Sequence, residues 1–202
     1  IHHAQVDAVN KTRARLKEEV GKAHALAGHL WERYSGRLSR GEMESLVREA
    51  LRPMRFREGR GYYFATALDG VEQLFADRPE MEGRNLLDCQ DPLGRWVIRD
   101  MIHIARGPGE GFYEYLWTQP GKEGADHPKI AYVKLFAPLG WLLGTGEYVT
   151  DMEDEARRDA LDWLRRMKCE DGAYLLVGEW DGVALIGPAP GTKPEGRVAE
   201  QV

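Results

Sequence analysis

Three strand-like segments in the second half of the sequence carry aromatic and basic side chains that could bind a small anion. The segments span residues 111–117, 129–136 and 140–148, and their candidate side chains include Tyr115, Trp117, Lys129 and Tyr132. A cation beside phenol and indole donors suits a small anion. We therefore predict that this part of the chain binds a small anion in a recess.

Side-chain alternation divides the candidates between the two faces of the predicted strands. Tyr115 and Trp117 lie two residues apart, so they share one face and form an apolar wall with O–H and N–H donors. Lys129 and Tyr132 lie three residues apart, so they cannot both line the recess unless a bulge intervenes. We favour Tyr132, because a lysine is more easily solvated, and we add Tyr148 as a further candidate.

An earlier pair of strands is predicted to close the recess. Asp69-Gly70 is a strong signal for a two-residue hairpin turn, because the glycine tolerates a positive φ. The turn joins a strand over residues 62–68 to a return strand over residues 71–75. Phe64 and Thr66 lie on one face of the first of these strands and are expected to face the ligand.

Four helices are predicted from apolar residues that recur at steps of three and four. The first spans about residues 5–34, and its narrow apolar stripe also suits pairing with a second copy of the chain as a coiled coil. The second begins at a capping box formed by Ser39 and Glu42. The other two are expected over residues 91–106 and 150–167.

The predicted order of elements is helix, helix, two strands, helix, three strands, helix. It indicates an α+β fold with a PAS-like five-stranded antiparallel sheet, a long N-terminal helix and flanking helices packed on one side of the sheet. We divide the chain into the first two helices (1–54), the sheet module (55–150), an exit helix (151–171) and a tail (172–202). The tail repeats the pattern of residues 61–84, so we expect it to begin a second, related module.

The charge of the chain argues against nucleic acid as a partner. The 202 residues carry a net charge of −5, whereas a phosphate-binding face needs an excess of lysine and arginine. We interpret one basic cluster as a solvated connection; it consists of Arg52, Arg55, Arg57 and Arg60.

Catalysis and metal binding find no support in the sequence. No serine lies in a glycine elbow, and His24 and His29 are five residues apart, which does not match a helical zinc pair. We therefore predict that the chain is not an enzyme, has no metal site and holds no cofactor.

Seven short motifs follow one another between residues 61 and 146. They begin at Gly61, Leu68, Asp91, Arg99, Gly111, Pro128 and Gly140, and include Gly111-Phe-Tyr-Glu-Tyr-Leu-Trp117 and Gly140-Trp-Leu-Leu-Gly-Thr-Gly146. In type and order they resemble the Cache domains of bacterial receptors, specifically the type 2 single-Cache pattern, and the repeat in the tail suggests a tandem variant. Two positions depart from that pattern, which has His-Pro at Phe75-Ala76 and Trp at Leu139.

The resemblance implies an extracytoplasmic sensor domain of a histidine kinase, chemoreceptor or cyclase, in the periplasmic or extracellular part of an inner-membrane receptor. Membrane contact is then expected only through flanking transmembrane helices that are absent from this sequence. The family's ligands are often small carboxylates such as acetate, propionate, pyruvate or lactate, so the resemblance implies that the anion is a small organic acid. Arg99 matches the family's basic position on the pocket helix and is implied to supply the cation, and Lys129 and Tyr132 also match the pattern.

Two other functions stay open at this point. The module could dimerise or dock a partner protein without a small ligand, its aromatic side chains forming only core. It could also bind haem or flavin, as PAS-type sensors do. A homodimer through the N-terminal helix is a further expectation.

Overall fold

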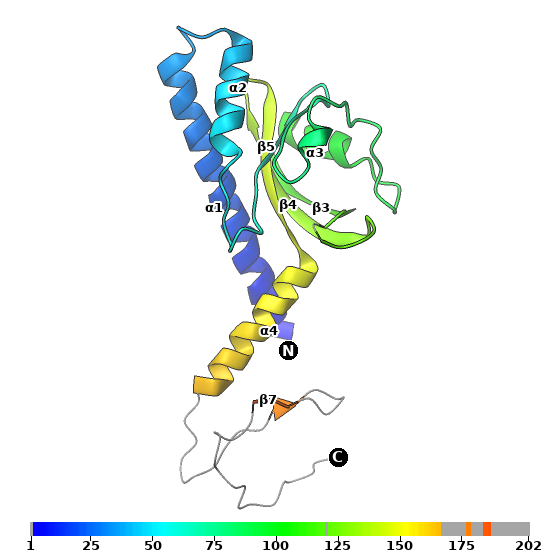
Figure 1. Ribbon diagram of the computed structural model, residues 1–202. Coiled ribbons are helices and arrows are strands. Elements are labelled where there is room, and N and C mark those ends of the chain that lie inside the picture. The colour runs from blue at the N-terminus through cyan, green and yellow to red at the C-terminus, as the bar shows by residue number, and fades with distance from the viewer. Residues whose placement is uncertain (1, 120, 167–176, 179–183, 187–202) are drawn as a thin grey trace, which may run out of the picture. The chain divides into compact units, whose positions relative to one another are not determined.

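The computed structural model describes residues 2–119, 121–166, 177–178 and 184–186 (Figure 1). Its helices are α1 (His2–Tyr34), α2 (Arg40–Leu51), α3 (Val97–Arg106) and α4 (Val149–Arg166), with a 3-10 helix η1 (Pro79–Met81). Its strands are β1 (Phe64–Ala67), β2 (Glu72–Phe75), β3 (Glu110–Trp117), β4 (His127–Phe136), β5 (Trp141–Tyr148), β6 (Val177–Gly178) and β7 (Ala184–Ile186). The chain divides after Met152 into two units, and the first contains the main sheet.

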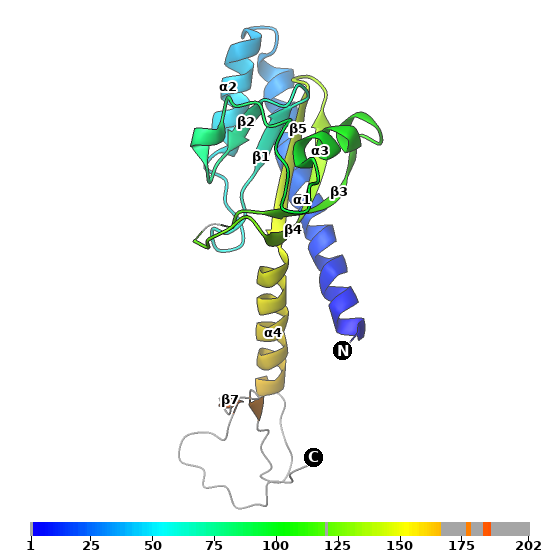
Figure 2. The same cartoon turned by 90° about the vertical axis from the view of Figure 1, so that its right-hand side faces the viewer.

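The main sheet is antiparallel and has the strand order β2-β1-β5-β4-β3. Helices α1 and α2 cover one of its faces, and α3 covers the other (Figure 2). The predicted α+β fold with a five-stranded antiparallel sheet and a long N-terminal helix is therefore confirmed. The expectation that the helices pack on one side is wrong, because α3 has a strongly apolar stripe of its own, with Val97, Met101 and Ala105 all buried.

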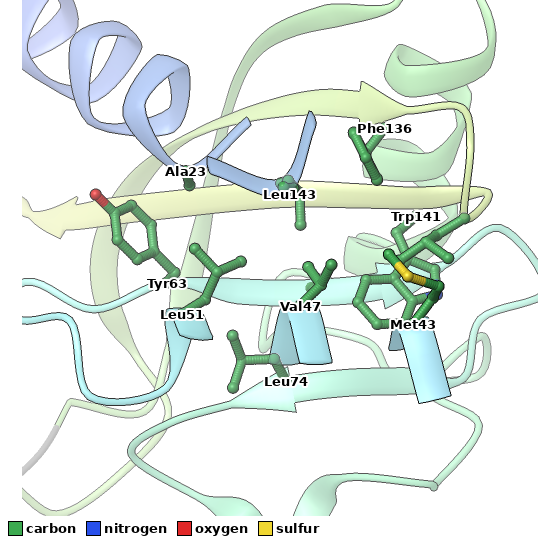
Figure 3. Packing of buried hydrophobic residues seen from close by; sticks show 12 residues of the cluster. Ala23, Met43, Val47, Leu51, Tyr63, Leu74, Phe136, Trp141 and Leu143 are labelled. Carbon is green, nitrogen blue, oxygen red and sulfur yellow. The ribbon is translucent and has the colours of Figure 1, made fainter. Parts of the chain in front are cut away.

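The face of the sheet beneath α1 and α2 is packed with apolar side chains (Figure 3). Met43, Val47 and Leu51 recur at steps of four along α2 and form one cluster with Leu74 of β2 and Trp141 of β5. Each of these five residues is at most 1% exposed, and burying such a side chain contributes roughly 1.5–3 kcal/mol. This packing fixes the sheet from one side, while the opposite face is covered by α3.

The start of α2 agrees with the sequence. The Glu42 N–H donates to Ser39 Oγ at 3.4 Å, and the Ser39 N–H donates to Glu42 Oε2 at 2.7 Å. These reciprocal bonds satisfy backbone donors that the first turn of a helix leaves unpaired. The predicted capping box is therefore confirmed.

The start of α3 differs from the sequence prediction, which placed it at Asp91. The Asp91 carboxylate accepts the N–H groups of Leu93 and Arg95 within a turn. Gly94 has a φ of 78°, a left-handed conformation that a helix cannot contain. The helix therefore begins only at Val97.

The β1–β2 hairpin has a longer loop than the predicted two-residue turn. The Gly70 N–H donates to Ala67 O at 2.8 Å, and the Ala67 N–H donates to Val71 O at 2.9 Å. Gly70 has a φ of 91°, which is the conformation that closes a three-residue loop. Next to the loop the register is therefore shifted by one, so Thr66 lies opposite Glu72, and an irregularity between Ala65 and Thr66 restores the register of a two-residue turn at Phe64 and Phe75.

In the tail, the described strands β6 and β7 pair antiparallel. The expected repeat over residues 172–197 falls mostly outside the described residues, and the domain boundaries stay predictions. Among the helices that are described, none is long and apolar enough to cross a membrane.

Candidate functional site

A small cavity lies between α3 and the face of the sheet that this helix covers. Its volume is about 20 Å³, which is enough to hold about one water molecule. Aliphatic side chains of α3 and aromatic side chains from the sheet line most of it. Lys129 of β4 and Glu72 of β2 also line it.

Lys129 is the cation of this cavity. The residue is 3% exposed, and its Nζ donates to the Tyr62 hydroxyl at 2.9 Å. The ammonium group also lies 4.8 Å from the ring centres of Tyr62 and Tyr148. Burial lowers the pKa of Lys129 to about 7, although the charge of Asp77 acts in the opposite direction. An anion that binds beside this lysine would therefore favour its charged form.

The backbone of β5 makes room for the Lys129 side chain. Lys129 lies opposite Tyr148, and Gly146 is two residues away on the same face. A Cβ atom at Gly146 would lie 2.8 Å from Lys129 Cε and 2.9 Å from Ile130 O. The close approach of the lysine stem to the strand therefore requires a glycine here.

Tyr115 and Trp117 form an aromatic wall of the cavity, on the shared face that alternation predicts. Their ring centres are 5.6 Å apart in an edge arrangement, and Tyr113 stacks on Tyr115 from the other side. Burial raises the pKa of Tyr115 well above its usual value, so its hydroxyl is a neutral donor. Among the described residues this hydroxyl has no hydrogen-bond partner, so it is available to a ligand.

Glu72 is absent from the predicted site residues, yet it lines the cavity. It is 3% exposed, and its Oε2 accepts a hydrogen bond from the Thr66 hydroxyl at 2.8 Å. Burial raises the pKa of Glu72 to about 8, although the bond from Thr66 acts in the opposite direction. A regular two-residue hairpin would place Gln73 opposite Thr66, and the irregularity between Ala65 and Thr66 that brings Glu72 there has no signal in the sequence.

The structure brings most of the predicted residues to this site. The ring of Phe64 lines the cavity and lies over Gly144, where a Cβ atom would come within 2.4 Å of it. Tyr148 flanks Lys129 and donates its hydroxyl to Thr118 O at 2.5 Å. The predicted residues that gather here are Phe64, Thr66, Tyr115, Trp117, Lys129 and Tyr148.

Tyr132 does not line the cavity. It lies opposite Thr145 and packs with Leu16 and Val20 of α1 on the other face of the sheet. No register shift occurs between β4 and its neighbours, so a bulge does not bring Tyr132 and Lys129 to one face. The preference for Tyr132 over Lys129 is therefore wrong, because the lysine is buried against aromatic rings rather than solvated.

Arg99 does not supply the cation of the cavity. Its guanidinium donates to Leu87 O at 2.7 Å and to the Asp88 carboxylate, and lies 4.2 Å from the ring centre of Trp96. Its side chain is 47% exposed. The implied role is wrong because α3 turns its apolar stripe toward the sheet and Arg99 toward the surface.

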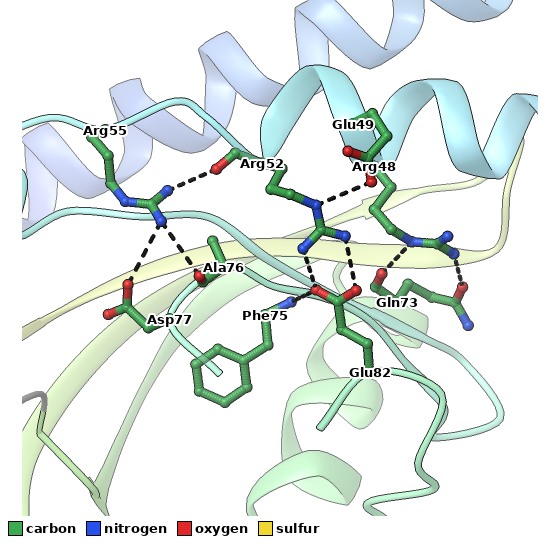
Figure 4. A network of polar contacts seen from close by, with 9 residues as sticks. All are labelled: Arg48, Glu49, Arg52, Arg55, Gln73, Phe75, Ala76, Asp77 and Glu82. Carbon is green, nitrogen blue, oxygen red and sulfur yellow. Dashed lines mark hydrogen bonds and ion pairs between the residues drawn. The ribbon is translucent and has the colours of Figure 1, made fainter. Parts of the chain in front are cut away.

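Arginines at the end of α2 and directly after it hold β2 in place from the outer edge of the sheet (Figure 4). Arg52 donates two parallel hydrogen bonds to Glu82, each 2.8 Å long, and Glu82 Oε1 also accepts the Phe75 N–H at 2.9 Å. Arg48 donates through Nε to Gln73 O at 2.5 Å. These bonds fix the outer edge of β2 together with the backbone hydrogen bonds that Glu72 forms with Gly83 and Arg84.

Two further arginines of the basic cluster are also engaged, so its interpretation as a solvated connection is wrong. Arg55 lies 3.7 Å from the Asp77 carboxylate, and Arg57 pairs with the buried Glu147 at the end of β5. Arg15 of α1 donates to the same Glu147 at 2.8 Å. The strand that contributes Tyr148 to the site is thereby joined to α1 on the opposite face.

A wider depression of about 350 Å³ opens on the surface beside the cavity. Tyr62 and Phe75 belong to the walls of both spaces, and Asp77, Gln119 and Lys122 add polar groups to the outer one. The rings of Tyr62 and Phe75 are stacked, with their centres 5.9 Å apart and an interplanar angle of 19°. Within the described residues, no group of three or more metal-binding side chains exists.

Comparison with known proteins identifies the family. A family model described as Cache domain matches residues 1–199. Over 130 residues the chain is 30% identical to the methyl-accepting chemotaxis protein McpP of Pseudomonas putida. The aligned region is 63% of this chain and 23% of that protein. Over 92 residues it is 33% identical to the sensor histidine kinase MctS of Rhizobium johnstonii, covering 46% of this chain and 20% of that protein. The chain thus spans less than a quarter of the length of these relatives.

Solved structures agree with this match. A periplasmic sensor domain of a chemotaxis protein is 31% identical, has a TM-score of 0.65 and covers 70% of this chain and 97% of its own. A Cache chemosensory domain described for carboxylic acid recognition is 25% identical and has a TM-score of 0.63. The match covers 71% of this chain and 97% of that domain. These are sensor domains, so the prediction that the chain is not an enzyme is confirmed. The chain belongs to the Cache domains, the sensor domains of chemotaxis receptors and sensor histidine kinases.

Proposed function

We propose that the chain is the extracytoplasmic ligand-sensing domain of a bacterial signalling receptor and binds a small organic carboxylate in the cavity beside α3. The observation that carries the proposal is Lys129, an ammonium group that is 3% exposed in an aromatic cavity. No ion pair joins it to a carboxylate in the described part of the chain. A buried charge without a counter-ion is unfavourable, so a ligand carboxylate would stabilise it.

Neutral donors around the lysine support the same ligand class. The hydroxyl of Tyr62 contacts the ammonium group, and the free hydroxyl of Tyr115 lines the cavity. Hydrogen bonds from neutral donors to a carboxylate are charge-assisted and stronger than those between neutral groups. The similar Cache domain described for carboxylic acid recognition supports a carboxylic acid as the ligand. Within that class we propose an acid such as acetate, propionate, pyruvate or lactate.

The size of the cavity supports a conformational response. A volume of about 20 Å³ suits about one water molecule, so an organic acid must move the walls in order to enter. Tyr148 flanks Lys129, and the adjacent Glu147 bonds to Arg15 of α1. A ligand that favours the expanded arrangement would therefore shift the position of α1 relative to the sheet.

Calorimetric titration with acetate, propionate, pyruvate and lactate tests the proposal. Replacing the buried lysine by an uncharged side chain of similar length, Lys129→Met, should weaken binding by about a hundredfold or more. Arg99→Met is the matched control, because it removes a cation outside the cavity and should leave affinity nearly unchanged. A folded domain that binds none of these acids contradicts the small-acid proposal and favours a docking module. Unchanged affinity in Lys129→Met would place the site elsewhere.

The location and assembly of the domain are part of the same proposal. A periplasmic or extracellular position agrees with the periplasmic sensor domain to which the chain is similar. A homodimer through α1 would allow a shift of that helix to pass to a second subunit. Light scattering of the purified domain with and without an acid measures whether such a dimer forms.

A further inference from the structure

Asp91 joins two walls of the ligand cavity with one buried carboxylate. Its Oδ1 accepts the N–H groups of Leu93 and Arg95 at 2.9 and 3.0 Å, and these bonds shape the turn that leads into α3. Its Oδ2 accepts Arg95 Nε at 2.7 Å and the Leu116 N–H of β3 at 3.1 Å. The carboxylate therefore ties the approach to α3 to the edge strand of the sheet.

The bonds from this turn to β3 lie on either side of Tyr115. Arg95 Nη1 donates to Glu114 O at 2.9 Å, and the buried carboxylate accepts the Leu116 N–H. Backbone groups of successive residues point to alternate edges of a strand, so Tyr115 turns its own backbone toward β4, where Lys129 lies directly opposite. Side chains that lie opposite each other share one face, with Cβ atoms roughly 4.5–5.5 Å apart. The turn thus holds Tyr115 beside the lysine of the cavity.

Asp91 keeps its negative charge at neutral pH. Burial acts against ionisation, but the hydrogen bonds from Arg95, Leu116 and Leu93 outweigh it and lower the pKa of Asp91 to about 2. Hydrogen bonds to an ionised carboxylate are roughly twice as strong as those between neutral groups. The attachment of β3 is therefore constant across the pH range in which Lys129 titrates.

We propose that Asp91 is a positioning residue of the ligand site, which holds the Tyr115 hydroxyl beside the Lys129 ammonium group so that both contact one carboxylate. This inference rests on the proposed function, since it takes the ligand carboxylate to bind Lys129. Without the bonds to Asp91, the outer edge of β3 loses its attachment around Tyr115. Ordering of the tyrosine then falls on the ligand, and this cost weakens binding.

Asp91→Asn separates the attachment of β3 from the turn itself. The amide oxygen can still accept the two N–H groups of the turn, but the amide nitrogen then faces the Leu116 N–H and Arg95 Nε, which are both donors. In calorimetry with acetate, propionate, pyruvate and lactate, this variant should bind about tenfold more weakly than the unaltered domain. Asp88→Asn is the matched control, because within the described residues this exposed carboxylate of the same loop bonds to Arg99 and not to β3. It should change affinity by less than about twofold.

A double-mutant cycle measures whether Asp91 acts through Tyr115. Tyr115→Phe removes the hydroxyl and should weaken binding by about tenfold or more. With Tyr115→Phe already present, Asp91→Asn should cost less than about threefold, because the group that it positions is absent. A change that only destabilised the fold would act equally in both backgrounds. Val47→Ala controls for lost stability, since it removes buried atoms from the other face of the sheet and should leave affinity within about twofold.

Arg95→Met takes the place of Asp91→Asn if the latter does not fold. It removes the bond to Glu114 O but leaves the Leu116 N–H bonded to Asp91, so it should weaken binding about threefold, and only when the Tyr115 hydroxyl is present.

The outcomes distinguish this inference from the proposed function. Unchanged affinity in Asp91→Asn overturns the positioning role but leaves carboxylate sensing intact. Equal losses with and without the Tyr115 hydroxyl overturn it in the same way. A folded, unaltered domain that binds none of the four acids overturns the proposed function and this inference with it.

Discussion

Lys129 combines deep burial with a charge that the ligand, rather than the protein, is suited to neutralise. Its pKa of about 7 means that it is about half protonated in the empty domain at neutral pH. A carboxylate binds the protonated form and stabilises it. Binding at and above neutral pH is therefore accompanied by proton uptake.

Carboxylate affinity should fall as the pH rises above about 7, by up to about tenfold per pH unit until the higher pKa of the complex is reached. Titrations of one acid across this range measure the slope. Lys129→Met should show a much flatter profile, and a constant affinity in the unaltered domain would contradict the assignment.

Glu72 should make the stability of the fold depend on pH. Its ordinary pKa is 4.5, and burial raises it to about 8 in the folded domain. The folded state therefore holds an extra proton between these values, so stability is fully present below pH 4.5 and is lost as the pH rises toward 8. At pH 7, Glu72→Gln should increase the free energy of unfolding by on the order of 3 kcal/mol, with little effect near pH 4.

Urea denaturation at these two pH values measures the difference. Glu114→Gln is the matched control, because the Glu114 side chain is 65% exposed and should change stability by less than about 0.5 kcal/mol. If Glu72→Gln is no more stable than the unaltered domain at pH 7, the carboxyl group is ionised in the fold.

At the scale of elements, the edge strand β2 decides the shape of one end of the cavity. It carries Glu72 and Phe75, and its outer edge is bonded to the backbone of Gly83 and Arg84 and to the side chains of Arg48 and Glu82. The bidentate pair of Arg52 and Glu82 is the centre of this attachment, because Glu82 also accepts a backbone N–H of the strand. A change in α2 therefore reaches the ligand site through β2.

Arg52→Met should destabilise the domain by about 1–3 kcal/mol, because it leaves the partly buried Glu82 carboxylate without its cation. It should also weaken ligand binding, since the position of β2 is less well defined. Arg37→Met removes an exposed arginine of the same charge and should alter neither property. Thermal unfolding and calorimetry on both variants provide the comparison, and equal effects of the two would remove any special role for Arg52.

At the scale of the whole module, α1 and the ligand cavity lie on opposite faces of one sheet and share β5. Glu147 and Tyr148 are neighbours on that strand, and alternation sends one side chain toward α1 and the other toward Lys129. A rearrangement of Tyr148 on binding thus moves the backbone that carries Glu147. This is a short physical connection between the ligand and the helix.

Hydrogen exchange can test that connection. In the unaltered domain, an acid should change the protection of the α1 backbone around Leu16 and Val20, which pack on this face. Glu147→Gln should reduce that change while affinity falls by no more than about threefold, because Glu147 lies outside the cavity. Ligand-dependent protection of α1 that is unaffected by Glu147→Gln would mean that the signal takes another route.

The sequence predicts the order of elements and the aromatic wall because both follow from local periodicity. Tyr115 and Trp117 share a face in any regular strand, whatever lies around them. The choice between Lys129 and Tyr132 depends instead on which face α3 covers, and this is a tertiary property. General solvation preferences favour an exposed lysine, but Gly146 leaves the space in which this lysine is buried.

Glu72 and Arg99 show two other limits of sequence interpretation. A longer loop and an irregularity between Ala65 and Thr66 place Glu72 opposite Thr66, and Asp-Gly alone predicts neither of them. Arg99 matches a family position by spacing, but its direction depends on where α3 begins. That start is displaced to Val97 by the turn at Asp91.

The stacked rings of Tyr62 and Phe75 have a consequence for the speed of the response. Because they border both the cavity and the surface depression, an acid that moves between these spaces has to pass them. The pair then acts as a barrier that slows entry and exit alike. Phe75→Ala should raise the association and dissociation rate constants together and leave their ratio nearly unchanged. The lifetime of the bound state would therefore be set by these two aromatic rings rather than by the groups that bind the acid.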